Sequence, residues 1–149
     1  MAGIVIWESG RPFTVYSGSF TASNVVQSTA NCENCPDGLG YRQQETGRNF
    51  FFNAEQRSLF SFPAAGDVGN TGRNYFTAPT LFRLDLTVGK KIPLTERTNL
   101  EIRMEVQNAT NHPSFDIPTA VFTSSTFGRI NDSVVSTARR IQWAAKFSF

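Results

Sequence analysis

The last twelve residues of the chain, Ala138 to Phe149, alternate between two kinds of side chain. Apolar side chains recur at every second position, at Ile141, Trp143, Ala145, Phe147 and Phe149. The positions between them are polar or small, at Arg140, Gln142, Ala144, Lys146 and Ser148. Because successive side chains of a β-strand point to opposite faces, this pattern predicts a strand with one apolar face. A strand of this kind that ends on a bare Phe is typical of an outer-membrane barrel, whereas soluble termini usually fray.

The same alternation marks two further stretches, Leu81–Lys91 and Asn99–Thr110. In the first, one face carries Phe82, Leu84, Leu86 and Val88. In the second, one face carries Leu100, Ile102, Met104 and Val106. A strand as long as the first extends about 36 Å, and a tilt of ~40° leaves about 28 Å of vertical span. That span matches the apolar core of a bilayer, so the two stretches predict a hairpin with a lipid-facing side.

The N-terminal stretch Ala2–Glu8 is also rich in β-forming residues. Ser9–Pro12 interrupts it, and Phe13–Ser17 resumes β character. We expect Ala2–Glu8 to be the end of a strand whose beginning precedes Met1. The first residues carry no secretory signal, which an outer-membrane protein needs, so we expect that Met1 is not the natural start of the polypeptide.

The connections between these strands differ in length. Gly18–Pro79 and Asn111–Thr137 are long and polar, whereas Ile92–Thr98 makes a tight connection. Ala54–Leu59 is expected to form one or two helical turns within the first long connection. Outer-membrane barrels combine short periplasmic turns with long extracellular loops, which predicts that Leu94–Arg97 is periplasmic.

Composition supports an all-β protein. Charged residues make up 17% of the chain, below the roughly 25% of soluble domains. Phe accounts for 14 of the 149 residues. No apolar run approaches the ~18 residues of a membrane helix, but barrel strands are short and only half apolar. The net charge of +2 gives no indication of a nucleic-acid partner.

Several motifs along the chain, in their order and spacing, resemble those of a known protein family. They are Trp7–Phe13, Phe52–Asn53, Gly69–Asn74, Pro79, Asp85, Lys90–Arg97, Glu105, Asn108–Phe115, Phe127–Ile130 and Arg139–Phe149. Together they resemble the C-terminal end of TonB-dependent outer-membrane receptors, in particular the Oar-like type with a carboxypeptidase-regulatory-like N-terminal domain. The resemblance covers residues 1–149, which correspond to only the last part of such a receptor. It implies an antiparallel meander of about four to five strands with long loops, the C-terminal part of a transmembrane β-barrel.

The resemblance also implies a location and partners. The location is the outer membrane of a Gram-negative type of cell. The partners are membrane lipid, the rest of the barrel, the plug domain, the barrel-assembly machinery and, through the missing N-terminal part, the energy-coupling TonB protein. The expected function is uptake or surface binding of a ligand by the intact receptor. The end of the chain resembles the barrel-assembly signal of such proteins, with Ala144 in place of the usual Gly, at Gln142, Ala144, Phe147 and Phe149.

Cys32 and Cys35 form a single CxxC pair. A zinc site needs four ligands, and a thioredoxin-like motif needs a βαβ setting, so neither is indicated. In an oxidising envelope the two cysteines are expected to form a small loop disulfide, with free thiols as the alternative. His112 is the only histidine, and we interpret it as structural or solvated. The sequence indicates no catalytic residue, cofactor or metal site, and an enzyme is not expected.

Charged side chains gather on the face opposite the apolar rows. They are Arg83, Asp85, Glu101, Arg103, Glu105 and Lys146. If the barrel is correct, they face its lumen. Cross-strand charge pairing in a polar interior is the first interpretation, and contact with a solute or the plug is the second.

Aromatic residues are expected to form belts at the bilayer edges, with an ordinary β core as the alternative. The candidates are Trp7, Tyr75, Phe76, Phe82, Trp143 and the terminal Phe residues. The alternative fold is a soluble or secreted β-sandwich that serves as a binding module. That fold requires the row from Leu100 to Val106 to be buried against a second sheet.

Overall fold

The computed structural model describes residues 1–35, 43–45, 47–130, 134–136 and 138–149. The chain divides into two compact units. The first, called the sheet unit, consists of Met1–Glu8, Leu81–Ser114 and Val135–Phe149. The second, called the loop unit, consists of Ser9–Thr80 and Phe115–Val134. Much of the two long connections therefore belongs to a single compact unit of its own.

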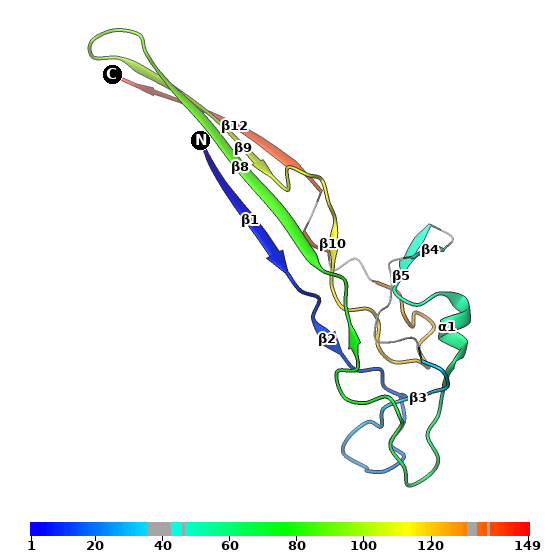
Figure 1. The fold of residues 1–149 in the computed structure, drawn as a ribbon. Coiled ribbons are helices and arrows are strands. Elements are labelled where there is room, and N and C mark those ends of the chain that lie inside the picture. Colours follow the sequence, from blue (N-terminus) through cyan, green and yellow to red (C-terminus); the bar gives the residue numbers. More distant parts are fainter. Residues whose placement is uncertain (36–42, 46, 131–133, 137) are drawn as a thin grey trace. The chain divides into compact units, whose positions relative to one another are not determined.

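Four long antiparallel strands make up the main sheet of the sheet unit (Figure 1). They are β1 (Ala2–Glu8), β8 (Leu81–Pro93), β9 (Asn99–Gln107) and β12 (Arg140–Ser148). Their order in the sheet is β1-β8-β9-β12, so each long strand pairs with the next long strand along the chain. This confirms the predicted antiparallel meander.

The connection between β8 and β9 is the short turn that the sequence predicts. Pro93, which has no amide hydrogen to donate, is the last residue of β8. The Leu94 N–H donates to the Thr98 carbonyl over 2.9 Å, and this bond closes the turn.

The strand register separates the side chains of the sheet into two faces. Residues that lie opposite each other on neighbouring strands share a face. Leu86 lies opposite Val106, which lies opposite Ile141 on its other side. The apolar side chains of this face are Val5, Trp7, Phe82, Leu84, Leu86, Val88, Ile92, Leu100, Ile102, Met104, Val106, Ile141, Trp143, Ala145 and Phe147. Lys90 is the one charged side chain that the register of these four strands places on this face.

The polar face carries all six charged residues singled out from the sequence. They are Arg83, Asp85, Glu101, Arg103, Glu105 and Lys146. Ile4 and Ile6 of β1 lie opposite Asp85 and Arg83, so they also belong to the polar face. The alternation in the sequence therefore predicted the faces of β8, β9 and β12 correctly.

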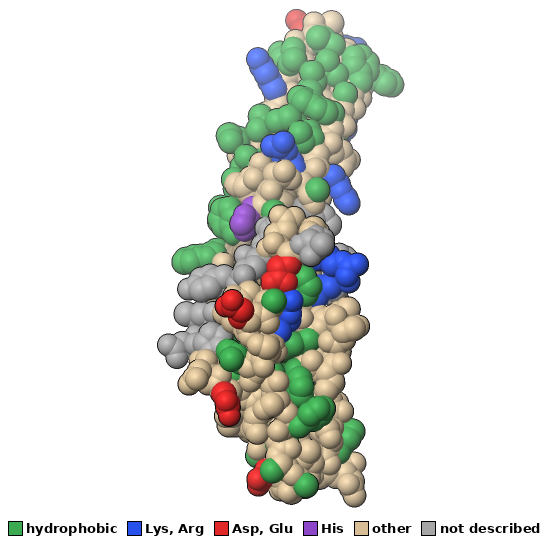
Figure 2. All heavy atoms as spheres, turned by 90° about the vertical axis from the view of Figure 1, so that its right-hand side faces the viewer, with side chains coloured by type: hydrophobic (Ala, Val, Ile, Leu, Met, Phe, Trp, Pro, Cys, Tyr) green, Lys and Arg blue, Asp and Glu red, His purple; other side chains and the backbone are tan. Residues whose placement is uncertain are grey.

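No residue of β1, β8, β9 or β12 is buried. Trp7 exposes 78% and Trp143 66% of its surface. Figure 2 shows hydrophobic side chains gathered at the top of the view, over the end of the sheet that carries the β8–β9 turn. A β-sandwich would bury one face of such a sheet. The alternative of a β-sandwich requires the row from Leu100 to Val106 to be buried, and none of its residues is buried in the structure.

The buried apolar residues lie in the loop unit instead. They are Phe13, Val15, Ala30, Cys32, Phe51, Phe52, Phe60, Phe76, Ala78, Phe127 and Ile130. Phe52 is fully buried, and its ring centroid lies 4.9 to 6.5 Å from those of five other rings, at Phe13, Phe51, Phe60, Phe76 and Phe127. Most of these residues lie in the stretches that the sequence predicts to be long, irregular connections. In the structure they form an aromatic core.

Short elements frame this core. The paired strands are β2 (Pro12–Phe13) with β7 (Phe76–Thr77), β3 (Asn31–Cys32) with β6 (Phe60–Ser61), and β4 (Gln43–Glu45) with β5 (Arg48–Phe50). Apart from the elements of the core, β10 (Ser114–Phe115) pairs with β11 (Val134–Ser136), and each of these two strands has residues in both units. The helix α1 (Ala54–Ser58) confirms the expected helical turn. Asn53 and Gln56 cap its first turn reciprocally, as a capping box does.

Two sequence-based expectations need correction. Phe76 is fully buried in the aromatic core, so it is not part of a membrane-edge belt. The third strand ends at Gln107 and not at Thr110. Its end has a backbone cause, because Asn108 has a φ of 50°, which takes the chain out of the extended conformation.

Candidate functional site

The apolar face is the first candidate functional surface. It extends across four strands without a buried residue. In β8, apolar side chains occupy every second position from Phe82 to Val88. A surface this large, exposed and apolar marks an interaction site, because soluble monomers rarely expose such patches.

The polar face contains two ion pairs that run along a strand. The guanidinium of Arg83 donates to both carboxylate oxygens of Asp85, over 2.9 and 2.6 Å. In the second pair, Nε of Arg103 lies 3.1 Å from Oε1 of Glu105. Each pair joins two residues of the same strand, two positions apart. The expectation that these four residues pair across strands is therefore wrong. Glu101 lies between Lys91 and Lys146 in the register, with opposite charges on both neighbouring strands.

A hydrogen-bonded junction lies where β9 ends. The Asn108 N–H donates to Oδ1 of Asp85 over 2.8 Å, and the Ala109 N–H donates to the Leu84 carbonyl over 2.7 Å. Asp85 thus receives hydrogen bonds from Arg83 and from the backbone of the neighbouring strand's end. This carboxylate ties β8 to the point at which the chain leaves β9.

The side chain of Asn108 organises the following turn. It is 2% exposed, its amide donates to the His112 carbonyl over 3.2 Å, and its Oδ1 accepts from the His112 N–H over 3.1 Å. Asn111 Oδ1 accepts from the Arg139 N–H over 3.1 Å, just before β12 begins. The motif that begins at Asn108 therefore links the ends of β8, β9 and β12. His112 contributes through its backbone, as a structural residue.

The comparison with protein families decides what this sheet is. A family model described as an outer membrane beta barrel domain matches residues 1–142. The chain belongs to this family. Searches of the curated proteins and of the solved structures found no match. In an outer-membrane barrel domain the outward face contacts lipid, so the apolar face is the lipid-facing surface of this barrel domain.

The residues of the expected assembly signal divide between the two faces of the barrel domain. Gln142 and Ala144 share the polar face with their β9 partners Glu105 and Arg103. Phe147 lies on the apolar face opposite Leu100. Phe149 follows the end of β12 and exposes 96% of its surface. Gln142, Ala144 and Phe147 therefore lie on β12, and Phe149 directly follows its last residue, Ser148.

Cys32 and Cys35 are joined by a disulfide in the structure, with their Cα atoms 5.4 Å apart. Cys32 belongs to β3 and is buried in the aromatic core, and Cys35 packs against that core. The bond therefore fixes a turn at the edge of the core. Among the described residues, no three His, Cys, Asp or Glu side chains gather as metal ligands. No helix in the described part of the chain is long and apolar enough to cross a membrane.

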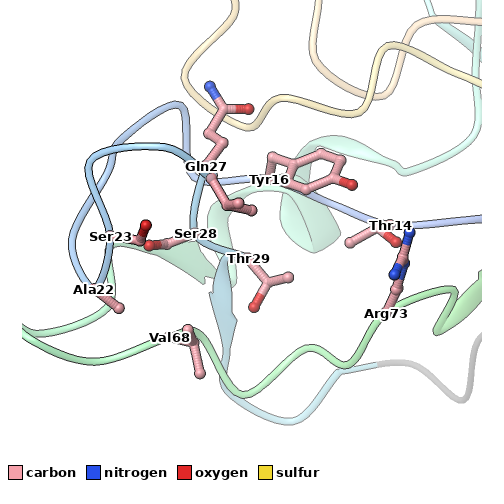
Figure 3. A pocket seen from close by; sticks show the side chains of 10 residues that line it. Thr14, Tyr16, Ala22, Ser23, Gln27, Ser28, Thr29, Val68 and Arg73 are labelled. Carbon is pink, nitrogen blue, oxygen red and sulfur yellow. The ribbon is translucent and has the colours of Figure 1, made fainter.

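The loop unit holds a pocket of about 390 Å³ that sequence analysis did not find (Figure 3). Its walls come from three segments of the chain and include Thr14, Tyr16, Val26, Ser28, Val68 and Arg73. Half of the side chains that line it are small or hydroxylic, and the others are two valines, a tyrosine, a glutamine and one arginine; these types are common in ordinary loops. Only the folding of distant segments together reveals the pocket, so no local pattern could have shown it.

Proposed function

We propose that this barrel domain is the closing part of a TonB-dependent outer-membrane receptor of the Oar-like type, in the outer membrane of a Gram-negative type of cell. The intact receptor would bind a ligand at the cell surface and import it. The observation that carries the proposal is the combination of a lipid-facing sheet with a large folded loop unit. Extended, folded extracellular loops suit a protein that captures a ligand before transport.

The open edges of the sheet support a larger barrel. The smallest outer-membrane barrels have about eight strands, and plugged transporters about 22. The main sheet has four strands, with β1 and β12 at its edges. Their outer edges present backbone groups that lipid cannot satisfy, so further strands must pair with them. We assign those strands to the rest of the receptor barrel.

Each surface of the domain then has a role in the receptor. The apolar face contacts lipid, and the polar face contacts the plug domain or a passing solute. The β12 residues Gln142, Ala144, Phe147 and Phe149 present the signal for the barrel-assembly machinery. The loop unit receives the ligand on the outside of the cell. The energy-coupling TonB protein acts on the N-terminal part of the receptor, and this domain carries out no catalysis.

Binding to TonB tests the proposal directly. The whole receptor, purified in detergent, is expected to bind the isolated periplasmic domain of the TonB protein, as measured by biolayer interferometry. A receptor that lacks its N-terminal segment provides the control and is expected not to bind. If the whole receptor shows no binding, it is an outer-membrane barrel of another kind.

A further inference from the structure

The pocket of the loop unit has the size of a ligand site. Its volume is about 390 Å³, within the ~300–1,000 Å³ that is usual for small-molecule sites. All its lining residues belong to the described part of the loop unit. The chemistry of those residues indicates which class of ligand fits.

Arg73 is the one charged residue that lines the pocket. Arg73 is exposed, and within the described residues its guanidinium takes part in no ion pair, as is also true of Arg48, Arg139 and Arg140. A pocket with one unpaired guanidinium and no carboxylate attracts an anion. The planar fork of Arg favours a carboxylate, which it can bind through two parallel hydrogen bonds.

The pocket carries its one charged group at one end. Figure 3 shows Arg73 beside Thr14 there, and Val68 and Ala22 toward the other end, with Ser23 and Ser28 beside Ala22. Tyr16 and Thr29 lie between these two ends. A ligand that uses the whole pocket therefore needs an anionic group and an apolar part.

The walls of the pocket are held in place by hydrogen bonds between the three segments. Thr14 Oγ1 accepts from the Asn74 N–H over 2.8 Å, next to Arg73. Thr29 Oγ1 donates to the Gly69 carbonyl over 3.0 Å, next to Val68. A Cβ at Gly69 would lie 2.2 Å from the Ala30 carbonyl oxygen, so only glycine permits this close approach. A preformed pocket loses little entropy when a ligand binds.

We propose that this pocket binds a small amphipathic carboxylate. Its carboxylate group pairs with Arg73, and its apolar part packs against Val26 and Val68. The inference rests on the proposed receptor function, because it supplies the class of ligand that the loop unit captures. Binding to the pocket is an equilibrium property of the receptor and needs no energy from TonB.

Matched acid and amide probes test the proposal on the whole receptor in detergent. The probes are N-acetyl-L-leucine and N-acetyl-L-leucinamide, which differ only in the charged group, and binding is measured by isothermal titration calorimetry. The acid is expected to bind at least about tenfold more tightly than the amide. Arg73→Gln is expected to remove this difference. Arg48→Gln, which changes an exposed arginine of β5 outside the pocket, is expected to retain it.

The outcomes separate this inference from the proposed function. Equal binding of the two probes, binding of neither, or an Arg73→Gln receptor that still prefers the acid would overturn the carboxylate site. Any of these results can occur in a receptor that binds TonB, so the site can fail while the receptor function stands. Preference for the acid in a receptor that does not bind TonB would keep the site and reject the transport role.

Discussion

Replacing Phe52 by alanine tests whether the loop unit is a folded unit or a set of flexible loops. Phe52 is fully buried and packs against five other aromatic rings. Its ring contacts both segments of the loop unit. Phe60 belongs to the segment Ser9–Thr80, and Phe127 belongs to the segment Phe115–Val134. Phe52→Ala would leave a cavity at the centre of that core.

The magnitude of the effect follows from this burial. Truncating a buried Phe to Ala costs about 3–5 kcal/mol, through lost transfer free energy and the cavity left behind. The neighbouring rings surround the site from several sides, so we expect about 4 kcal/mol of lost stability of the loop unit. Since each 1.4 kcal/mol is a factor of ten, the open population rises by roughly 10²–10³-fold.

Hydrogen exchange of backbone amides in the whole barrel protein measures this opening. Peptides from β5 to β6 are expected to exchange roughly 10²–10³-fold faster in Phe52→Ala, and peptides from β8 and β9 are expected to stay protected. Phe62→Ala is the matched control, because Phe62 is 56% exposed and contacts the ring of Phe122. That change should cost no more than about 1 kcal/mol. Equal exchange in the two variants would refute the existence of a cooperative aromatic core.

Three further changes probe the other features of the domain. Val88→Arg on the lipid-facing side of β8 should destabilise the barrel protein in lipid vesicles by about 2–4 kcal/mol, and Thr87→Arg on the polar face should have little effect, both measured by urea unfolding. Asn108→Ala removes the two part-buried hydrogen bonds to the His112 backbone and should cost about 2 kcal/mol, seen as a lower midpoint in the same titration; an unchanged midpoint would show that the turn contributes nothing. The double change Cys32→Ser with Cys35→Ser opens a small covalent loop and should cost the loop unit about 2 kcal/mol, detectable as faster exchange around β3; exchange at the native rate would contradict this.

The sequence allowed the main sheet to be predicted because a period of two is a local property. Leu84, Val88 and Met104 could be assigned to one face without knowledge of the pairing, and the register confirms the assignment. The short β8–β9 turn was also predictable, since Pro93 marks the end of a strand.

The loop unit could not be predicted in the same way. Its core joins Phe13, Phe52, Phe76 and Phe127, which are far apart in the chain and follow no period. Phe76 was therefore assigned to a membrane belt, although it is buried. The ion pairs of the polar face were likewise undetermined, because the choice between Asp85 and a cross-strand partner for Arg83 depends on the rotamers of both side chains.

The two units place opposite demands on the shape of an apolar side chain. Hydrocarbon tails are fluid and fill any outline, so Leu84, Val88 or Ile102 could be exchanged among aliphatic residues with little penalty. Phe52 meets five rigid neighbours, and no aliphatic residue reproduces its outline. Natural variants of this protein should therefore exchange one aliphatic residue for another on the apolar face of the sheet. They should retain phenylalanine at the buried positions of the loop unit.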